Sequence, residues 1–327
     1  MRTRHALPFF TAALLSAGAA QAQEKFVYMS NWYAQAEHGG FYQALAAGLY
    51  KKAGLDVTIK MGGPQVNGMQ LLAAGQVDCF MGYDVQTMKA REQGINAVTV
   101  AAAFQKDPQV MIGHPEVVKK MEDLKGKTIL ISGDANTNYW PWLKTTFGLS
   151  DSQVRPYTFN IQPFVADKNV VQQGYLSSEP YAIEKEAKFK PSTFLLSDHG
   201  WPPYSTTIVC MEDTLKKKPK AVAAFVQASM QGWKDYLKGD PSAANALIKK
   251  DNPNMTDDLL ANGIKLLLSS GMVFSGDAAK FGVGIVTDDR MKKTYDMMVA
   301  MKLLDPAKVD LKKTYTTEFV KDLKILP

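Results

Sequence analysis

The sequence is poor in the residues that metal and redox sites require. Its 327 residues include two cysteines, Cys79 and Cys210, and four histidines. No CxxC or HExxH spacing occurs, so the composition excludes a cysteine-rich metal site and a disulfide framework. We therefore expect no metal and no cofactor. The two cysteines can pair with each other or stay buried as small apolar side chains.

Signatures of common enzymes are also missing. The sequence has no GxSxG nucleophile elbow and no phosphate-binding P-loop. The run GVGIVTDD near residue 282 resembles a glycine-rich dinucleotide motif only superficially, because it lies between predicted helices rather than after a strand. We therefore assign no catalytic residues and expect that the protein is not an enzyme.

Arginine is scarce, and the positive charge is dispersed. The formal net charge is +6, and beyond the N-terminal segment only Arg91, Arg155 and Arg290 occur. The densest cationic cluster, residues 216–220, is interrupted by Pro219 and is typical of an exposed helix start. This charge pattern predicts no nucleic-acid partner.

No apolar run is long enough to span a membrane, so we expect no membrane insertion. The N-terminal segment instead has the order of a signal peptide. Arg2 and Arg4 precede an apolar stretch at 7–15, and AQA at 20–22 gives a small-x-small cleavage site. We predict a signal peptide over residues 1–22 and a periplasmic protein. A buried N-terminal helix is the alternative, which the order of the three blocks disfavours.

Strand and helix patterns alternate along residues 23–108, which we predict to be the first part of lobe 1. Short β-branched and aromatic runs predict strands, and amphipathic segments that end at glycine predict helices. The strands are expected at 25–30, 55–61, 77–82 and 97–104, and the helices at 39–53, 64–75 and 84–93. This alternation is typical of a mostly parallel sheet covered by helices on both faces.

A second unit of the same kind is predicted over 109–203 and forms lobe 2. Its strands are expected at 127–132, 154–159, 170–176 and 192–197, with one helix capped by Thr137 or Asn138 and another after Glu179. The chain crosses between lobes near 106–116 and 202–207. We predict that residues 204–327 return to lobe 1 and that their helices pack on it. These helices are expected at 219–237, 241–250, 256–269 and 288–303. The expected fold is thus α/β, with two lobes, a hinge and a ligand cleft. An ordinary two-domain enzyme would share this layout.

Several segments carry a family resemblance. The run NWYAQAEHGGFYQALAAGLYKKAGLDVTIKMGG and the later QLLAAGQVDCFMGY resemble periplasmic solute-binding proteins of ABC importers. MEDLKGKTILIS and GYLSSEPYAIEK resemble the second lobe of that family. The branch that shares its fold with fungal thiamine-pyrimidine synthesis proteins is the most similar. The resemblance implies a type II binding-protein topology, a monomer, and delivery of a solute to a permease and ATPase complex. It also makes the strands of Cys79 and Cys210 neighbours, so that a disulfide is one of two outcomes.

Loops after the predicted strands carry aromatic, amide and acidic side chains. Ligands of open α/β sheets bind outside the carboxyl ends of strands, so these residues are candidates for the ligand site. The candidates are Asn31, Trp32, Tyr33, His38, Tyr83, Asp84, Phe104, Asn138, Tyr139, Trp140, Tyr175, Glu179 and Tyr204.

Some candidates have a structural alternative. Trp32 can stack on a flat ligand or pack in the lobe, and His38 can bond to a ligand or to backbone. Asp84 can cap the following helix, whereas Glu179 is a poor cap and is therefore favoured as a ligand contact. Among the aromatic residues at 139, 140 and 142 we expect position 139 or 140 to face the cleft. The backbone of the same loop could hold an anion or a carbonyl.

No arginine lies in a predicted strand-end loop, so a bidentate clamp on a carboxylate, sulfonate or phosphate is not indicated. Aromatic rings together with Asn31, Asp84 and Glu179 suit a flat, nitrogen-rich heterocycle with amino donors. The resemblance points to an aminopyrimidine thiamine precursor. The alternatives are a flavin, a sulfonate or another organic solute, a ligand sensor, and a pyrimidine-forming enzyme. The resemblance implies for that enzyme a Cys-rich iron-binding segment, which this chain lacks.

Overall fold

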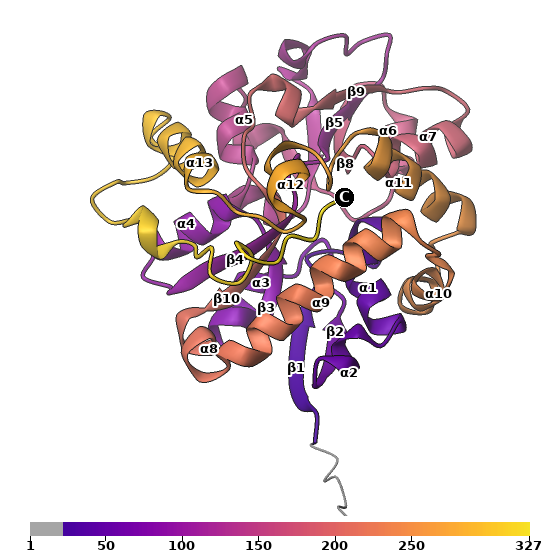
Figure 1. Ribbon diagram of the computed structural model, residues 1–327. Helices are drawn as coiled ribbons and strands as arrows, with labels where there is room; N and C mark the ends of the chain where they lie inside the picture. Colours follow the sequence, from indigo (N-terminus) through magenta and orange to yellow (C-terminus); the bar gives the residue numbers. More distant parts are fainter. Residues whose placement is uncertain (1–21) are drawn as a thin grey trace, which may run out of the picture.

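The computed structural model describes residues 22–327, so the predicted signal peptide lies outside the described residues except for its last position. The chain forms two five-stranded sheets (Figure 1). Sheet A contains β1 (Glu24–Met29), β2 (Leu55–Lys60), β3 (Cys79–Gly82), β4 (Ala97–Phe104) and β10 (Ser205–Met211). Sheet B contains β5 (Gln109–Gly113), β6 (Thr128–Ile131), β7 (Val154–Pro156), β8 (Val170–Tyr175) and β9 (Ser192–Leu195).

In each sheet one strand runs against the other four. The strand orders are β2-β1-β3-β10-β4 and β7-β6-β8-β5-β9, and β10 and β5 pair antiparallel with both neighbours. These two strands directly follow the crossings between sheets at 105–108 and 196–204. Both connections are shorter than the dozen or more residues that a parallel crossover needs. The predicted α/β class with two mostly parallel sheets is confirmed.

Helices surround both sheets (Figure 1). Around sheet A and its strand ends lie α1 (Gly39–Ala46), α2 (Leu49–Lys52), α3 (Gly68–Ala73), α4 (Asp84–Glu92), α8 (Glu212–Lys217), α9 (Pro219–Lys238), α10 (Ser242–Asp251) and α13 (Asp288–Ala300). The remaining helices are α5 (Trp140–Phe147), α6 (Gln162–Ala166), α7 (Glu179–Ala187), α11 (Asp257–Ser269) and α12 (Gly276–Phe281).

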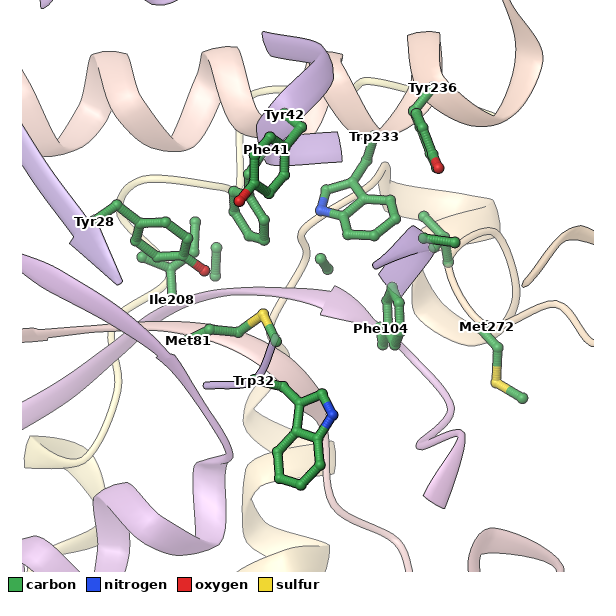
Figure 2. Close-up of a cluster of buried hydrophobic side chains, with 14 of the residues drawn as sticks. Tyr28, Trp32, Phe41, Tyr42, Met81, Phe104, Ile208, Trp233, Tyr236 and Met272 are labelled. Carbon is green, nitrogen blue, oxygen red and sulfur yellow. The ribbon is translucent and has the colours of Figure 1, made fainter. Parts of the chain in front are cut away.

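Of the late helices, α9 and α10 contact α1 and α13 contacts α4, whereas α11 contacts both α7 and α9. Glycine lets α1 and α9 approach closely, since a Cβ on Gly232 would lie 2.2 Å from the Gly40 carbonyl oxygen. Figure 2 shows Phe41, Phe104 and Trp233 among the buried side chains of this region, in the same cluster as Trp32.

Four local predictions were wrong. The helix expected to be capped by Thr137 or Asn138 begins at Trp140, with Tyr139 as its N-cap. The helix expected at 39–53 is split into α1 and α2, because Gly48 adopts a left-handed conformation with φ of 66°. The helix expected from Pro64 begins only at Gly68, where the Asn67 side chain accepts the Gln70 N–H as an N-cap. The segment 106–116, expected to be a connection, contains β5.

The two cysteines form a disulfide between adjacent strands of sheet A. Cys79 on β3 and Cys210 on β10 are direct register partners, with Cα atoms 4.3 Å apart. Of the two outcomes that the sequence left open, the structure therefore shows pairing.

Candidate functional site

A tight cavity of about 30 Å³ lies between strand ends of the two sheets. The loop after β1 and the end of β3 supply its sheet-A side, which consists of Asn31, Trp32, Gln35 and Tyr83. Sheet B and its loops supply the opposite side, which consists of Gln109, Ser132, Asp134, Asn138, Tyr139, Gln173, Gly174, Tyr175 and Glu179. A ligand in this cavity would contact both sheets.

Aromatic rings bound the cavity on both sides. The Trp32 indole is 9% exposed and lies 6.0 Å, centroid to centroid, from the Tyr157 ring at an interplanar angle of 10°. The hydroxyls of Tyr83 and Tyr175 lie 2.6 Å apart, which joins the sheet-A side to the sheet-B side. A flat ring between such walls would gain stacking and apolar contact.

Glu179 opens α7 and reaches back over the end of β8. Its Oε2 accepts the Tyr175 N–H (2.8 Å) and its Oε1 accepts the Tyr157 hydroxyl (3.1 Å). Burial raises its pKa to about 7, although these bonds oppose the shift. A Cβ on Gly174 would lie 2.9 Å from the Glu179 Cβ, so glycine is what allows the carboxylate to lie against the strand.

Asp134 is the second acid of the cavity. It follows β6 in the 3-10 turn η3 (Asp134–Thr137), and its Oδ1 accepts the Gln86 Nε2 from α4 (2.6 Å). Burial raises its pKa to about 6, and the bonds from Gln86 and Asn138 oppose the shift. The cavity thus contains two carboxyl groups, of which Glu179 is buried and Asp134 is half-buried.

Three further acceptor atoms of the lining are buried without a hydrogen-bond partner. They are Asn31 Oδ1, Gln35 Oε1 and Asn138 Oδ1. Buried polar atoms are normally satisfied, so this set indicates where donors of a ligand would be placed. No lysine, arginine or histidine is among the described residues that line the cavity. Its chemistry therefore suits a neutral or cationic ligand that carries N–H donors.

The cavity collects seven of the residues that the sequence suggested, namely Asn31, Trp32, Tyr83, Asn138, Tyr139, Tyr175 and Glu179. Sequence reasoning missed Gln35, Gln109, Ser132, Asp134, Gln173 and Gly174. Asp134 sits in a loop that had been singled out for its backbone, and Ser132 ends the predicted strand before it. The adjacent polar residues Gln172 and Gln173 inside a predicted strand were a signal that could have been used.

The other six predicted residues lie outside the lining of this cavity. Tyr33 packs edge-on against Trp32. Phe104 packs edge-on against Trp233 in the core, 5.1 Å between centroids. His38 is fully buried, and burial lowers its pKa to about 3, so it is neutral and part of the interior.

Three of these side chains make contacts within the fold, namely those of Asp84, Trp140 and Tyr204. Asp84 is buried and accepts the Val85 N–H, the Tyr204 N–H and the Thr294 hydroxyl. Tyr204 contacts α13 through Thr287, and the Arg290 guanidinium lies over its ring at 4.8 Å.

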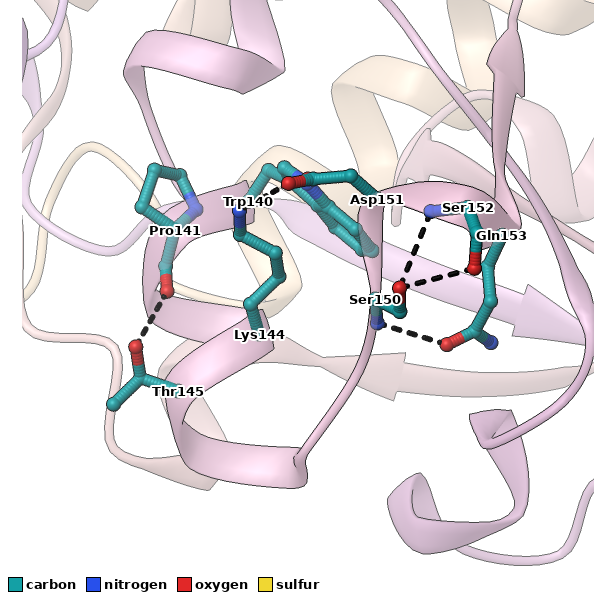
Figure 3. Close-up of polar contacts among 8 residues, drawn as sticks. All are labelled: Trp140, Pro141, Lys144, Thr145, Ser150, Asp151, Ser152 and Gln153. Atoms are coloured by element: carbon teal, nitrogen blue, oxygen red, sulfur yellow. Dashed lines mark hydrogen bonds and ion pairs between the residues drawn. The ribbon is translucent and has the colours of Figure 1, made fainter.

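Trp140 is not part of the cavity lining. Its Nε1 donates to Asp151 Oδ1 (2.8 Å), which also holds Lys144 through its other oxygen (Figure 3). The loop 150–153 presents Asp151 to the indole, so Tyr139 rather than Trp140 faces the ligand space.

Among residues 22–327, no helix has the length and apolar character needed to cross a bilayer. In the same range no three His, Cys, Asp or Glu side chains cluster in a way that could hold a metal ion.

Two named relatives differ in activity. The chain is 23% identical over 236 residues to the formylaminopyrimidine-binding protein of Halalkalibacterium halodurans, covering 70% of this chain and 71% of the relative. It is 21% identical over 253 residues to a 4-amino-5-hydroxymethyl-2-methylpyrimidine phosphate synthase, THI11, of Saccharomyces cerevisiae, covering 72% of this chain and 74% of the relative. One relative is thus named as a binding protein and the other as a synthase.

Solved structures share the fold of this chain, and a family model matches its sequence. A protein of Bordetella bronchiseptica RB50 superimposes with a TM-score of 0.71 at 15% identity, over 92% of this chain and 97% of that protein. The periplasmic aliphatic sulphonate-binding protein SsuA of Escherichia coli superimposes with a TM-score of 0.63 at 13% identity, over 89% and 91%. The family model described as NMT1/THI5 like matches residues 35–244. The chain therefore belongs to the NMT1/THI5-like family.

Proposed function

We propose that this protein is the solute-binding subunit of an ABC importer and captures an aminopyrimidine of the thiamine-precursor type. The observation that carries the proposal is the chemistry of the cavity. Trp32, Tyr83, Tyr139 and Tyr175 supply ring faces and edges, while acceptors without a cation surround the same space. A flat heterocycle with exocyclic and ring nitrogens meets both demands.

The relatives support a pyrimidine more than a sulfonate. The relative from Halalkalibacterium is named for binding formylaminopyrimidine, and the synthases make a phosphate of a related pyrimidine. The resemblance to the sulphonate-binding protein is a likeness of fold. A sulfonate would face Asp134 and Glu179 without a cationic side chain from the described lining.

We further propose that residues 109–203 form one lobe and residues 23–108 with 204–327 form the other, and that the lobes close around the solute by a hinge motion. The predicted signal peptide and the disulfide between Cys79 and Cys210 both support a periplasmic protein, because disulfides persist in oxidising compartments. A monomeric state and delivery to a permease and ATPase belong to the same proposal.

A thermal-shift screen with pyrimidines, flavins, purines, aliphatic sulfonates and amino acids tests the proposal. A bound solute stabilises the native state by mass action, so aminopyrimidines should raise the melting temperature most. Mass spectrometry should then recover the pyrimidine unchanged after long incubation with the protein. Product that accumulates with time would refute binding without turnover, and a shift with sulfonates alone would refute the solute class.

A further inference from the structure

The loop after β6 offers a ligand a carboxylate rather than an anion-binding backbone. Two of its N–H groups already have partners, because Ser132 N donates to Gln173 Oε1 (2.6 Å) and Gly133 N donates to the Pro64 carbonyl (2.9 Å). Asp134 follows them at once and lines the cavity. An anionic group at this end of the cavity would therefore meet a carboxylate.

A bond from the opposite side of the cavity holds Asp134 in place. Gln86 donates from Nε2 to Asp134 Oδ1 (2.6 Å), while its own Oε1 accepts the Tyr83 N–H (3.1 Å). The bond to Tyr83 fixes the orientation of the amide, so that the NH₂ group and not the carbonyl faces Asp134. Asp134 is thus hydrogen-bonded but has no cation beside it among the described lining residues.

Glu179 differs from Asp134 in its surroundings. Both of its oxygens accept bonds from the sheet-B side, from the Tyr175 N–H and the Tyr157 hydroxyl. Glu179 is buried and Asp134 is only half-buried, so burial disfavours the charged form of Asp134 less than that of Glu179. Discrimination between neutral and anionic solutes by charge therefore depends mainly on Asp134.

The geometry points to Asp134 as a specificity-determining residue that rejects anionic solutes. Resting on the proposed function, the inference is that Asp134 lets the cavity accept an amino-bearing pyrimidine and excludes the same pyrimidine once it carries a phosphate. A phosphate in this cavity would be desolvated beside a like charge, with no described lining cation to offset either cost. The unphosphorylated pyrimidine has no phosphate to desolvate and no negative charge for Asp134 to repel.

Calorimetric titration at pH 7.5 with 4-amino-5-hydroxymethyl-2-methylpyrimidine and with its phosphate ester tests this inference. We expect the wild type to prefer the unphosphorylated pyrimidine by about 100-fold or more, since like-charge juxtaposition costs several kcal/mol. Asp134→Asn should reduce that preference about tenfold or more, because asparagine keeps an acceptor for Gln86 and removes the charge. Asp56→Asn removes the same charge from the exposed side of β2 and should leave the preference unchanged.

The outcomes separate the inference from the proposed function. Tighter or equal binding of the phosphate by the wild type overturns the inference and leaves solute binding intact. An unchanged preference in Asp134→Asn shows that shape excludes the phosphate and also overturns it. Binding of neither pyrimidine by the wild type refutes the proposed function, and the inference falls with it. If Asp134→Asn does not fold, Asp134→Ser removes the charge with a smaller side chain and gives the same comparison.

Discussion

Trp32 has contacts compatible with both alternatives that the sequence left open, stacking on a ligand and packing in the lobe. The indole lines the cavity and also packs against Tyr157, and it is 9% exposed. A single side chain can therefore support the ring of a ligand and the loop that carries it. The same side chain thus lines the candidate site and contributes to the packing around it.

Trp32→Ala should affect affinity and stability separately. We expect aminopyrimidine affinity to fall by about 1–3 kcal/mol, by analogy with base stacking on aromatic residues. The free energy of unfolding should fall by about 3–5 kcal/mol, because a packed aromatic side chain is lost. Calorimetry measures the first and urea unfolding the second. Trp142→Ala, in the buried cluster with Trp201, is the control that should lower stability and spare affinity. Wild-type affinity in Trp32→Ala would remove the residue from the site.

Glu179→Gln should weaken binding of an aminopyrimidine by about 2–4 kcal/mol, because a charge-assisted bond is lost and a buried donor then faces the amino group of the ligand. Calorimetric titration measures this loss. Glu122→Gln, on an exposed glutamate of the same half of the chain, should leave affinity unchanged. Equal affinity in both variants would contradict a ligand contact for Glu179.

The same substitution should flatten the pH dependence of stability. The folded pKa of Glu179, about 7, lies above its ordinary value of 4.5. Its contribution to stability is therefore full below about pH 4.5 and is lost as the pH rises through 7. Between pH 4.5 and 8 the wild type should lose up to about 3 kcal/mol from this group, and Glu179→Gln should lack that part. Urea unfolding without ligand, repeated at several pH values, measures this difference. If the free energy of unfolding changes equally with pH in the two proteins, the Glu179 carboxyl is exposed to water and the prediction is wrong.

The strand-end rule located part of the site and missed the rest for identifiable reasons. Asn31 and Tyr83 directly follow strands that the sequence delimits well, so they could be predicted. Gln109 could not, because it begins a strand that the sequence presented as a connection. His38 and Phe104 satisfy the rule but point into the interior, and a sequence does not say which way a side chain turns.

At the scale of elements, the strands that follow the two crossings, β5 and β10, connect the other strands of each sheet. β5 was hard to predict because a short strand after a short connection has no helix to define its start, whereas the β-rich run that contains Cys210 indicated β10. Each of them nonetheless lies between two other strands and pairs with both. The alternation of strands and helices before each crossing predicted the rest of each sheet.

The disulfide between β3 and β10 should contribute to stability. Cys79 and Cys210 are 131 residues apart in sequence, so the bond restricts a long loop of the unfolded chain. Replacing both by serine should lower the free energy of unfolding by about 2–4 kcal/mol, the usual range for a native disulfide. Urea unfolding of the oxidised wild type and the double variant measures this. Reductant should destabilise the wild type alone, and two free thiols in unreduced, denatured protein would contradict the bond.

At the scale of the whole molecule, direct bonds span the space between the sheets around the cavity. The Tyr83 and Tyr175 hydroxyls pair, Gln86 donates to Asp134, and the Ser177 hydroxyl donates to Glu37. In the proposed hinge closure these bonds break when the lobes separate, so they should slow release of a bound solute.

Tyr83→Phe should speed dissociation of an aminopyrimidine by about 3–10-fold, because one hydrogen bond across the cavity is lost at about 0.5–1.5 kcal/mol. Stopped-flow tryptophan fluorescence measures the rate. Tyr50→Phe removes a buried hydroxyl bond to Ser229 on the sheet-A side and should leave the dissociation rate unchanged. Equal rates in Tyr83→Phe and the wild type would show that this bond does not hold the closed form.

The central claim is that a neutral, amino-bearing heterocycle is the solute. The most direct measurement is calorimetric titration of the unliganded protein with formylaminopyrimidine, with an aliphatic sulfonate titrated in parallel at the same pH. The absence of a cation among the described lining residues and the unpartnered acceptors of Asn31, Gln35 and Asn138 predict saturable one-to-one binding of the pyrimidine and no measurable binding of the sulfonate. Saturable binding of the sulfonate with none of the pyrimidine would contradict the account.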